Sequence, residues 1–598
     1  MSFASFGAAA RQVFRQRLPT TKSTLGNDSS LLSTSTGSLL SRSFRSTTRT
    51  MAQEYKLKSV TSLDLKPGDK QEVEVEGLPD AKVLLVNAAG KIQAIGPKCT
   101  HYGAPLVKGV LTTSGRITCP WHGACFSATT GDVEDAPALD ALPVFKVVER
   151  DGAVYVTGDE ATIKAGRRKP KFQCSSVQKG EEGKVVVVGG GSGCIGLIEE
   201  LRERGFTGPI TVISNEGNLP IDRTKLSKAL LTDLAKLQWR DEEFYKSGAV
   251  EFVQDEVTGV DFKGKSVETK SKKTISYGKL VLATGGTPRN LPLEGFKTLD
   301  NIFTLRNVHD AKNIVSAIGE SKGKKIVVVG SSFIGMEVAN ATAKDNSVSV
   351  VGMEKVPLER VLGDKVGSAA QKGLEKSGVK FYMEAGVEKA TAHESDPAKV
   401  GAVLLKSGES LPADIVILGV GVAPATEFLR GNAGVQLLQD GSLEVDTAFA
   451  VTGVKDVYAL GDIATFPYHG PGAGGKGVRI EHWNVAQKSG REAAKHIVNP
   501  AGFKAEFFTP IFWSALSAQL RYCGNTMASG WDDVVIQGSL DEGKWSAFYA
   551  KGDEVVAVAT MGADPVMVQS AELMRRGKMP KKSELEKGMD VMSLGAPE

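Results

Sequence analysis

Four residues in two short stretches of the sequence could hold an iron–sulfur cluster. The first stretch is Cys99-Thr-His101, and seventeen residues later comes Cys119-Pro-Trp-His122. Two thiolates on one iron and two imidazoles on the other would bind a 2Fe–2S cluster. The alternative is tetrahedral zinc, which also accepts two Cys and two His. Zinc-site spacing pairs Cys with Cys and His with His. Here each stretch has one of each, so the pattern favours the iron–sulfur cluster.

The residues around these ligands resemble the ferredoxin and oxygenase branch of Rieske proteins. The cytochrome bc branch has an extra Cys in each loop, and Ala104 and Trp121 stand at those places here. It also has hydroxyl side chains that donate hydrogen bonds toward the cluster, where this chain has Ala124 and Phe126. Fewer donors stabilise the reduced cluster less. The resemblance therefore predicts a potential near the low end of the Rieske range, about −150 mV.

A dinucleotide-binding turn is expected after the valine run that begins at 185. The small residues Gly189, Gly191 and Gly193 let the backbone approach a pyrophosphate, which binds at the N-terminus of the following helix. The frame that starts where the strand ends is Gly189, Gly191, Cys194, and the alternative frame starts at Gly191. Glu216 follows the next strand about twenty residues on, where an acid binds the adenosine ribose.

Three further segments resemble ferredoxin-reductase-type flavoproteins and identify this first site as an FAD site. They are residues 219–228, 280–289 and 457–464. By that resemblance a basic pair contacts FAD, a Thr-Gly pair forms the second FAD turn, and an acid accepts a hydrogen bond from a ribityl hydroxyl. The residues in these roles are Arg223, Lys228, Thr284, Gly285 and Asp462.

A second fingerprint begins at the strand 325–329 and indicates an NAD(P)H site. Its positions are Gly330, Ser332 and Gly335, and because Ser332 replaces the middle Gly, we expect a less close backbone approach there. The site is inserted between two parts of the flavin domain, as in flavoproteins with two dinucleotide-binding domains. The resemblance places Glu337 near the nicotinamide; we expect no residue to act as nucleophile or general base.

The choice between NADH and NADPH depends on the residues after the next strand, 348–351. An acid directly after that strand would bind the ribose 2′-hydroxyl of NADH. That place is Gly352, and Glu354 lies two residues on, beside Lys355. We predict NADH, because Glu354 can still reach the ribose and would repel a 2′-phosphate, while NADPH stays the alternative.

Together these segments resemble the apoptosis-inducing-factor-like flavoproteins that carry a Rieske domain. The resemblance includes residues 481–483, whose Trp483 lies near the flavin face, and the C-terminal stretches 512–514 and 520–522. Such flavoproteins are ferredoxin-reductase-like. Disulfide reductases carry a Cys-x4-Cys pair in the first FAD domain; residues 226–230 contain no Cys, which argues against thiol–disulfide exchange.

The elements needed to position these residues predict a multidomain chain. We expect an all-β Rieske domain, then an α/β flavoprotein fold with two dinucleotide-binding domains, then a small α+β C-terminal domain. The predicted boundaries are 1–50 (targeting segment), 55–158 (Rieske), 159–183 (linker), 184–300 with 422–498 (FAD), 301–421 (NAD(P)H) and 499–598 (C-terminal reductase or interface domain).

Composition limits the partners and the compartment. The 598 residues carry a net charge of only +4, which predicts no nucleic-acid partner, and six Cys suit a reducing compartment. No apolar run is long enough to predict a transmembrane helix. Residues 1–50 are rich in Arg and Ser and have a single acid, Asp28, which predicts a mitochondrial transit peptide. Initiation at Met51 would give a cytosolic form.

The combined motifs predict an oxidoreductase that oxidises NAD(P)H through FAD and a Rieske cluster. The acceptor, which could be a protein, and the direction of flow through the cluster are left open, as is the oligomeric state. The alternative is a signalling or cell-death protein that uses NADH binding as a switch with little turnover.

Overall fold

The computed structural model describes residues 52–170, 172 and 183–595. The predicted targeting segment, residues 1–50, and Cys174 lie outside the described residues. Within the described ranges, no helix has the length and apolarity needed to cross a membrane.

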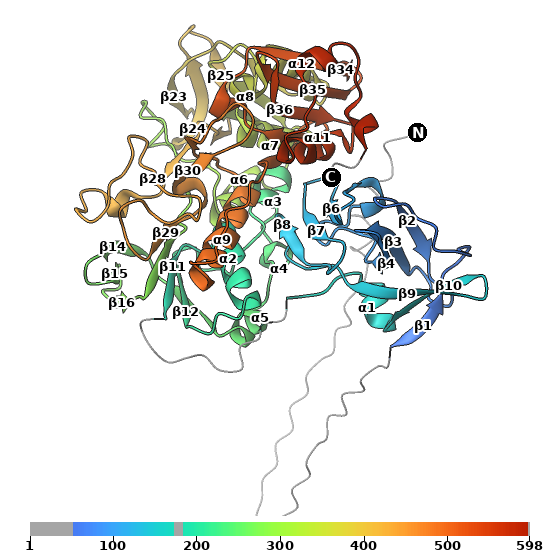
Figure 1. Ribbon diagram of the computed structural model, residues 1–598. Helices are drawn as coiled ribbons and strands as arrows, with labels where there is room; N and C mark the ends of the chain where they lie inside the picture. Colours follow the sequence, from blue (N-terminus) through green and yellow to red (C-terminus); the bar gives the residue numbers. More distant parts are fainter. Residues whose placement is uncertain (1–51, 171, 173–182, 596–598) are drawn as a thin grey trace, which may run out of the picture. The chain divides into compact units, whose positions relative to one another are not determined.

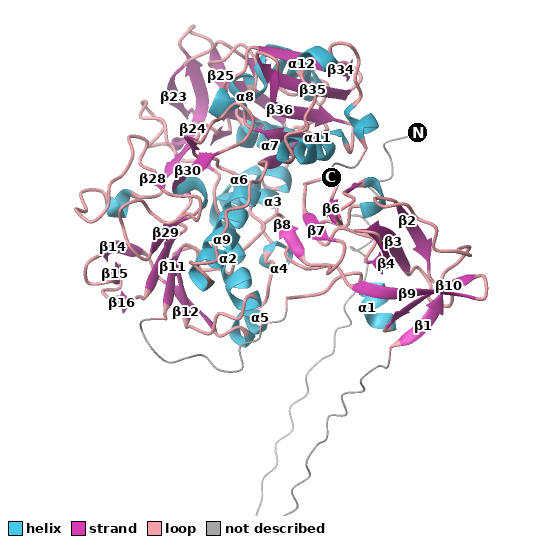
Figure 2. Cartoon of the chain, viewed as in Figure 1, coloured by secondary structure: helices cyan, strands magenta, loops and turns pink. Residues whose placement is uncertain are grey.

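The Rieske domain consists of two antiparallel sheets (Figures 1 and 2). One has the order β1-β10-β9-β4-β3-β2 and the other β5-β6-β7-β8. The strands are β1 (Gln53–Lys56), β2 (Lys70–Glu74), β3 (Lys82–Ala88), β4 (Lys91–Ile95), β5 (Val110–Leu111), β6 (Arg116–Thr118), β7 (Cys125–Ser127), β8 (Val133–Asp135), β9 (Val144–Arg150) and β10 (Ala153–Gly158). Since β4 ends before Cys99, and β6 and β7 flank residues 119–124, the two ligand stretches are loops between strands.

Helix α1 (Glu160–Ala165) lies inside the stretch 159–183 that the sequence indicated as a linker. Asp159 caps it by accepting a hydrogen bond from the backbone N–H of Thr162. Its Ile163 is buried in the same apolar cluster as Leu57 and Val154 of the Rieske sheet. Helix α1 therefore packs into the Rieske core. The sequence did not indicate this packing, because Ile163 is a single buried apolar residue in a polar stretch.

The FAD domain is built on a parallel sheet of order β13-β12-β11-β17-β29. Helices α2 and α9 pack against each other at Gly196, where an added Cβ would lie 2.3 Å from the carbonyl oxygen of Gln487. The elements of the first part are β11 (Val185–Val188), α2 (Ser192–Glu203), β12 (Ile210–Ser214), α3 (Thr224–Ala229), α4 (Leu234–Leu237), α5 (Glu242–Ser247), β13 (Val250–Gln254), β14 (Val257–Asp261), β15 (Ser266–Thr269), β16 (Thr274–Ser276), β17 (Lys279–Leu282) and β18 (Gly286–Pro288). The second part contributes β27 (Val422–Pro424), β28 (Leu443–Glu444), β29 (Val457–Ala459), β30 (Ala464–Tyr468), β31 (Lys476–Val478) and α9 (Trp483–Val498).

The inserted domain repeats this architecture with the parallel order β19-β26-β20-β21-β22. Its elements are β19 (Ile302–Thr304), α6 (Val308–Ile318), β20 (Lys325–Val329), α7 (Phe333–Thr342), β21 (Ser347–Val351), α8 (Glu359–Glu375), β22 (Lys380–Tyr382), β23 (Val387–His393), β24 (Asp396–Leu405), β25 (Ser410–Pro412) and β26 (Ile415–Leu418). Strand β29 of the FAD sheet comes after this insertion, so the chain leaves the FAD domain and returns to complete its sheet.

The C-terminal domain is an antiparallel sheet of order β32-β33-β36-β35-β34, followed in the chain by helix α11. Its elements are β32 (Ile511–Ala515), β33 (Gln519–Gly524), α10 (Thr526–Ser529), β34 (Asp533–Ser539), β35 (Lys544–Lys551), β36 (Glu554–Met561), α11 (Val566–Arg575) and α12 (Lys582–Leu585). The fold class predicted from the sequence is confirmed.

Candidate functional site

The two cluster loops close by the same backbone hydrogen bonds. In the first, the N–H of Cys99 donates to Ala104 at 2.8 Å, and the N–H of Gly103 donates to Cys99 at 2.9 Å. In the second, the N–H of Cys119 donates to Ala124 at 2.8 Å, and the N–H of Gly123 donates to Cys119 at 3.2 Å. Both glycines have positive φ, +78° and +73°, which a tight turn at that position requires. The shared pattern explains why Gly-Ala ends both motifs although the His lies at different offsets from the Cys.

The four predicted ligands meet as two pairs. The Nδ1 atoms of His101 and His122 lie 3.1 Å apart, and the thiols of Cys99 and Cys119 contact each other. All four side chains are buried, and burial lowers the pKa of His101 to about 4, so its imidazole is neutral, the form that binds metal. In the described part of the chain, no three His, Cys, Asp or Glu side chains form a single-ion site. The pairing two by two fits a binuclear cluster.

A cavity of about 1760 Å³ runs along both dinucleotide-binding domains. It is larger than the roughly 300–1,000 Å³ of a usual small-molecule pocket, and its lining includes both Gly-rich turns. The sequence-predicted FAD and NAD(P)H residues in that lining are Gly189, Gly191, Gly193, Glu216, Arg223, Lys228, Thr284, Gly285, Asp462, Trp483, Gly330, Ser332, Glu337 and Glu354. Gly335 lies just behind the second turn on α7.

The first turn has the shape that a pyrophosphate needs. A Cβ on Gly189 would lie 2.3 Å from the carbonyl oxygen of Ala283, so the strand ends pack too closely for a side chain. A Cβ on Gly191, which precedes α2, would have no described atom within 4 Å, so the space before the helix N-terminus is open. Cys194 is fully buried in the domain core, which explains why this place tolerates a residue larger than Gly.

Charged residues of the FAD side are held by partners across the cavity. The guanidinium of Arg223 pairs with both carboxylate oxygens of Glu216, at 2.7 and 2.9 Å. Asp462 pairs with Arg306 at 2.7 Å. Two buried polar atoms of this lining, Thr284 Oγ1 and Trp483 Nε1, have no hydrogen-bond partner among the described residues. Such atoms need a ligand or water, so the residues present fit an FAD.

The second turn repeats the geometry of the first. A Cβ on Gly330 would lie 2.4 Å from the carbonyl oxygen of Gly419, and one on Gly335 would lie 2.3 Å from that of Gly330. Ser332 precedes α7, and its hydroxyl donates to Gly419 at 2.9 Å. At the end of β21, Glu354 accepts a hydrogen bond from Ser331 at 2.8 Å.

Glu337 is the centre of a buried network that joins three domains. Its carboxylate pairs with Lys228 of α3 at 2.9 Å and accepts hydrogen bonds from Ser227 at 2.5 Å and from Ser514 of β32 at 2.7 Å. The sequence placed Glu337 and Lys228 in different nucleotide sites. The structure brings them together.

Aromatic side chains fill the space between the cluster ligands and the cavity. The ring of His122 lies 4.3 Å from that of Trp513, centroid to centroid. The ring of His101 lies 5.7 Å from Trp239 and 6.5 Å from Trp483, and both Trp483 and Trp513 line the cavity. Sequence reasoning gave no role to Trp239 or Trp513. The sequence signal that could have pointed to them is that Trp is rare, since the chain has six in 598 residues.

Buried polar contacts fix the Rieske domain in this position. Arg240 of the FAD domain pairs with Asp140 at 2.6 Å and with Glu199 at 2.8 Å. The hydroxyl of Tyr102, whose ring stacks on His101 at 3.9 Å, donates to Asp222. Asp222 lies in the flavin segment 219–228 and Tyr102 directly follows a predicted cluster ligand, but neither stretch indicates that the two side chains meet.

Comparison with known proteins agrees with this arrangement. Residues 183–490 match the family model of the pyridine nucleotide-disulphide oxidoreductases. The chain belongs to this family. Residues 55–146 match the Rieske 2Fe–2S domain, and residues 511–593 match the reductase C-terminal domain. This oxidoreductase therefore binds FAD, NAD(P)H and a 2Fe–2S cluster.

Its relatives include apoptosis-inducing factor 3 of Homo sapiens, 41% identical over 88% of this chain and 84% of the relative. Rhodocoxin reductase of Rhodococcus erythropolis is 29% identical over 63% of this chain and 86% of its own length. A covalent putidaredoxin reductase–putidaredoxin complex is 28% identical, with a TM-score of 0.64, covering 69% of this chain and 99% of the other. The oxidoreductase is ferredoxin-reductase-like, with an N-terminal Rieske domain.

Proposed function

We propose that this oxidoreductase carries electrons from NAD(P)H to a one-electron protein acceptor, with the Rieske cluster as the exit. When bound, FAD accepts a hydride from NAD(P)H and releases single electrons, which suits a one-electron cluster. The observation that carries the proposal is the packing of His122 on Trp513, because Trp513 also lines the dinucleotide cavity. One structural relative, a reductase in a covalent complex with putidaredoxin, supports a protein acceptor.

The chain's own residues orient the nucleotides and exclude water. We assign the FAD pyrophosphate to the turn 189–193 and the NAD(P)H pyrophosphate to the turn 330–335. The Lys228–Glu337 ion pair lies between the two sites, and its Glu337 is buried. Because the two charges are opposite, the pair adds no net charge there. Trp483 and Trp513 keep the boundary with the Rieske domain apolar and dry.

Tyr102 offers a route outward from the cluster. Its ring stacks on that of the ligand His101 at 3.9 Å with an interplanar angle of 12°, and the residue is 37% exposed. The ligand itself is 8% exposed. An acceptor that touches Tyr102 is therefore one ring away from a cluster ligand.

Two finer assignments complete the proposal. We propose NADH as the donor, because Glu354 lies in the cavity lining at the end of β21, where a 2′-phosphate would meet a carboxylate. We propose a mitochondrial location from the composition of residues 1–50, which lie outside the described residues.

A full-length variant that lacks the cluster tests whether electrons leave the protein through it. Cys119→Ser should retain bleaching of the flavin by NADH and reduction of ferricyanide, which can react at the flavin directly. It should lose transfer to protein acceptors such as cytochrome c. A variant that reduces the protein acceptor as fast as the wild type would show that the cluster is not the exit. Wild-type protein that binds NADH without turnover on any acceptor would favour the signalling alternative.

A further inference from the structure

A second cavity, of about 530 Å³, lies where the Rieske domain meets α2 and α9 of the FAD domain and α11 of the C-terminal domain. It shares no lining residue with the dinucleotide cavity. Seven Arg and Lys side chains and four Asp and Glu side chains line it, and the carboxylates of Glu492 and Glu572, just outside the lining, pair with several of these cations. Its volume falls in the usual range of small-molecule sites, roughly 300–1,000 Å³.

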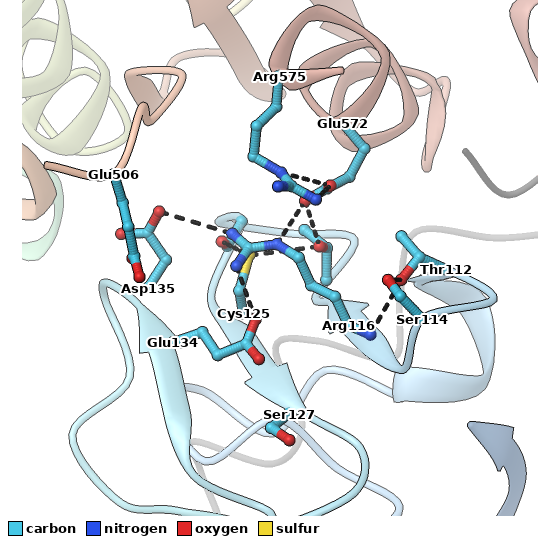
Figure 3. Close-up of polar contacts among 12 residues, drawn as sticks. Thr112, Ser114, Arg116, Cys125, Ser127, Glu134, Asp135, Glu506, Glu572 and Arg575 are labelled. Carbon is cyan, nitrogen blue, oxygen red and sulfur yellow. Dashed lines mark hydrogen bonds and ion pairs between the residues drawn. The ribbon is translucent and has the colours of Figure 1, made fainter. Parts of the chain in front are cut away.

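Part of this charge is used to hold the domains together. Figure 3 shows Arg116 of the Rieske domain between Glu134 and Glu572, at 2.7 and 2.8 Å. Arg575 pairs with the same Glu572 at 2.7 Å. These ion pairs occupy the guanidinium of Arg116 and the carboxylate of Glu572 and tie the Rieske domain to α11.

Arg491 of α9 is the buried cation whose hydrogen bonds are incomplete. Its side chain is 4% exposed, and its Nη1 donates to Glu200 at 2.8 Å. Its Nε and Nη2 have no hydrogen-bond partner among the described residues. Nε and one Nη together form the planar fork that matches two oxygens of an oxyanion. A buried guanidinium with open donors beside a polar cavity therefore indicates a missing acceptor.

Exposed cations from two domains complete the lining. Arg576 follows α11 and is exposed, and its side chain donates to Ser114 at 3.4 Å. Arg204 of α2 pairs with Glu200 through Nε at 2.6 Å, and its side chain is 46% exposed. Arg576 can reorient toward an occupant without losing a core contact, whereas Arg204 stays paired with the buried Glu200.

We propose that this cavity binds a small phosphate-bearing anion, gripped by Arg491 and closed over by Arg576. The phosphate is either free or esterified to a small molecule. Because Arg491 belongs to the FAD domain and Arg576 to the C-terminal domain, the bound anion bridges these two domains. The site stands apart from FAD and NAD(P)H binding, so its test does not depend on the proposed electron route.

The test is equilibrium dialysis of the full-length holoprotein, with NAD⁺ saturating the dinucleotide cavity. The probes are inorganic phosphate, pyrophosphate and AMP. We expect one saturable site per chain. Arg491→Lys keeps the charge but removes the fork and should weaken binding by about tenfold or more. Arg576→Ala, at an exposed position, should weaken it several-fold. The control Arg430→Ala removes an exposed Arg outside the cavity and should change nothing.

The source of the phosphate follows from the order of affinities. Tighter binding of AMP than of inorganic phosphate indicates an ester, and the reverse indicates a free anion. The ligand should also raise the Tm of the wild type, because it binds only the folded state, and raise that of Arg491→Lys less. The proposal is overturned if the wild type binds none of the probes saturably, or if Arg576→Ala and Arg491→Lys bind them as well as the wild type does.

Discussion

The imidazole of His122 and the indole of Trp513 lie 4.3 Å apart, centroid to centroid, with their planes tilted by 39°. Trp513 stands on β32, in the C-terminal domain, and His122, a ligand that the sequence predicts for the cluster, belongs to the Rieske domain. This contact joins residues 391 positions apart in the sequence. It connects the predicted cluster site to the dinucleotide cavity through a direct contact between two side chains.

Replacing Trp513 should slow electron transfer between the two redox centres. We expect Trp513→Leu to reduce the rate of cluster reduction several-fold, because the packed contact with His122 is lost, while bleaching of the flavin by NADH proceeds unchanged. Stopped-flow spectroscopy at flavin and cluster wavelengths measures both. Trp531→Leu is the control, since that ring packs on Tyr549. Equal cluster reduction in the two variants would exclude this route.

The ligand assignment predicts the effect of replacing the histidines. His101→Cys combined with His122→Cys should lower the potential from about −150 mV toward the −400 mV of all-Cys plant-type clusters. Thiolates replace neutral imidazoles and disfavour the reduced state. Redox titration followed by EPR measures the shift. Purified wild type that contains zinc and no labile sulfide would refute the assignment.

Glu354 should set the preference for NADH. Glu354→Ala should lower kcat/KM for NADH by about tenfold, the value of one charge-assisted hydrogen bond. The change should appear in KM, because the adenine end is remote from the hydride. Glu359→Ala is the matched control: it removes a carboxylate of the same lining, bonded to the backbone of Lys355. An unchanged NADH to NADPH ratio in Glu354→Ala would rule out this role.

The buried Arg240 should contribute strongly to the docking of the Rieske domain. Arg240→Met leaves the carboxylate of Glu199 buried without its paired cation and that of Asp140 with only Arg167, at 3.4 Å, for a cost of about 3–5 kcal/mol. We expect a lower Tm and faster proteolysis between the domains. Arg150→Ala breaks an exposed pair with Glu54 and should cost under about 1 kcal/mol. Similar losses in both variants would contradict the assignment.

His482 should make stability depend on pH. Burial lowers its pKa to about 4, against an ordinary value of 6.5; Asn484, Lys228 and Asp462 are the polar groups that act on it. Between these values the unfolded chain takes up a proton that the folded chain does not, so stability falls as pH drops from about 6.5 to 4. His482→Gln should weaken this dependence, measured as the difference in Tm between variant and wild type. Parallel Tm profiles would show that the pKa is not lowered.

The sequence by itself determined the cofactors and the order of the domains. Each cofactor is recognised by a short local stretch, a Cys-x-His or Gly-x-Gly-x-x-Gly pattern, whose backbone geometry the local residues dictate, as the matching turns at Gly189 and Gly330 show. Helix α1 escaped this reasoning because a single buried residue, Ile163, ties it to the Rieske core.

Only the tertiary structure decided how the cluster site and the dinucleotide cavity are placed relative to each other. Trp239 and Asp140 belong to no motif, and the motif stretches around Trp513 and Asp222 do not show which Rieske residue each contacts. An interface between domains needs complementary shape and charge and no fixed local pattern. The Lys228–Glu337 pair likewise forms across 109 positions of sequence. Such contacts arise when separately folded units bury their surfaces together, and their free energy depends on the distances and desolvation that packing sets.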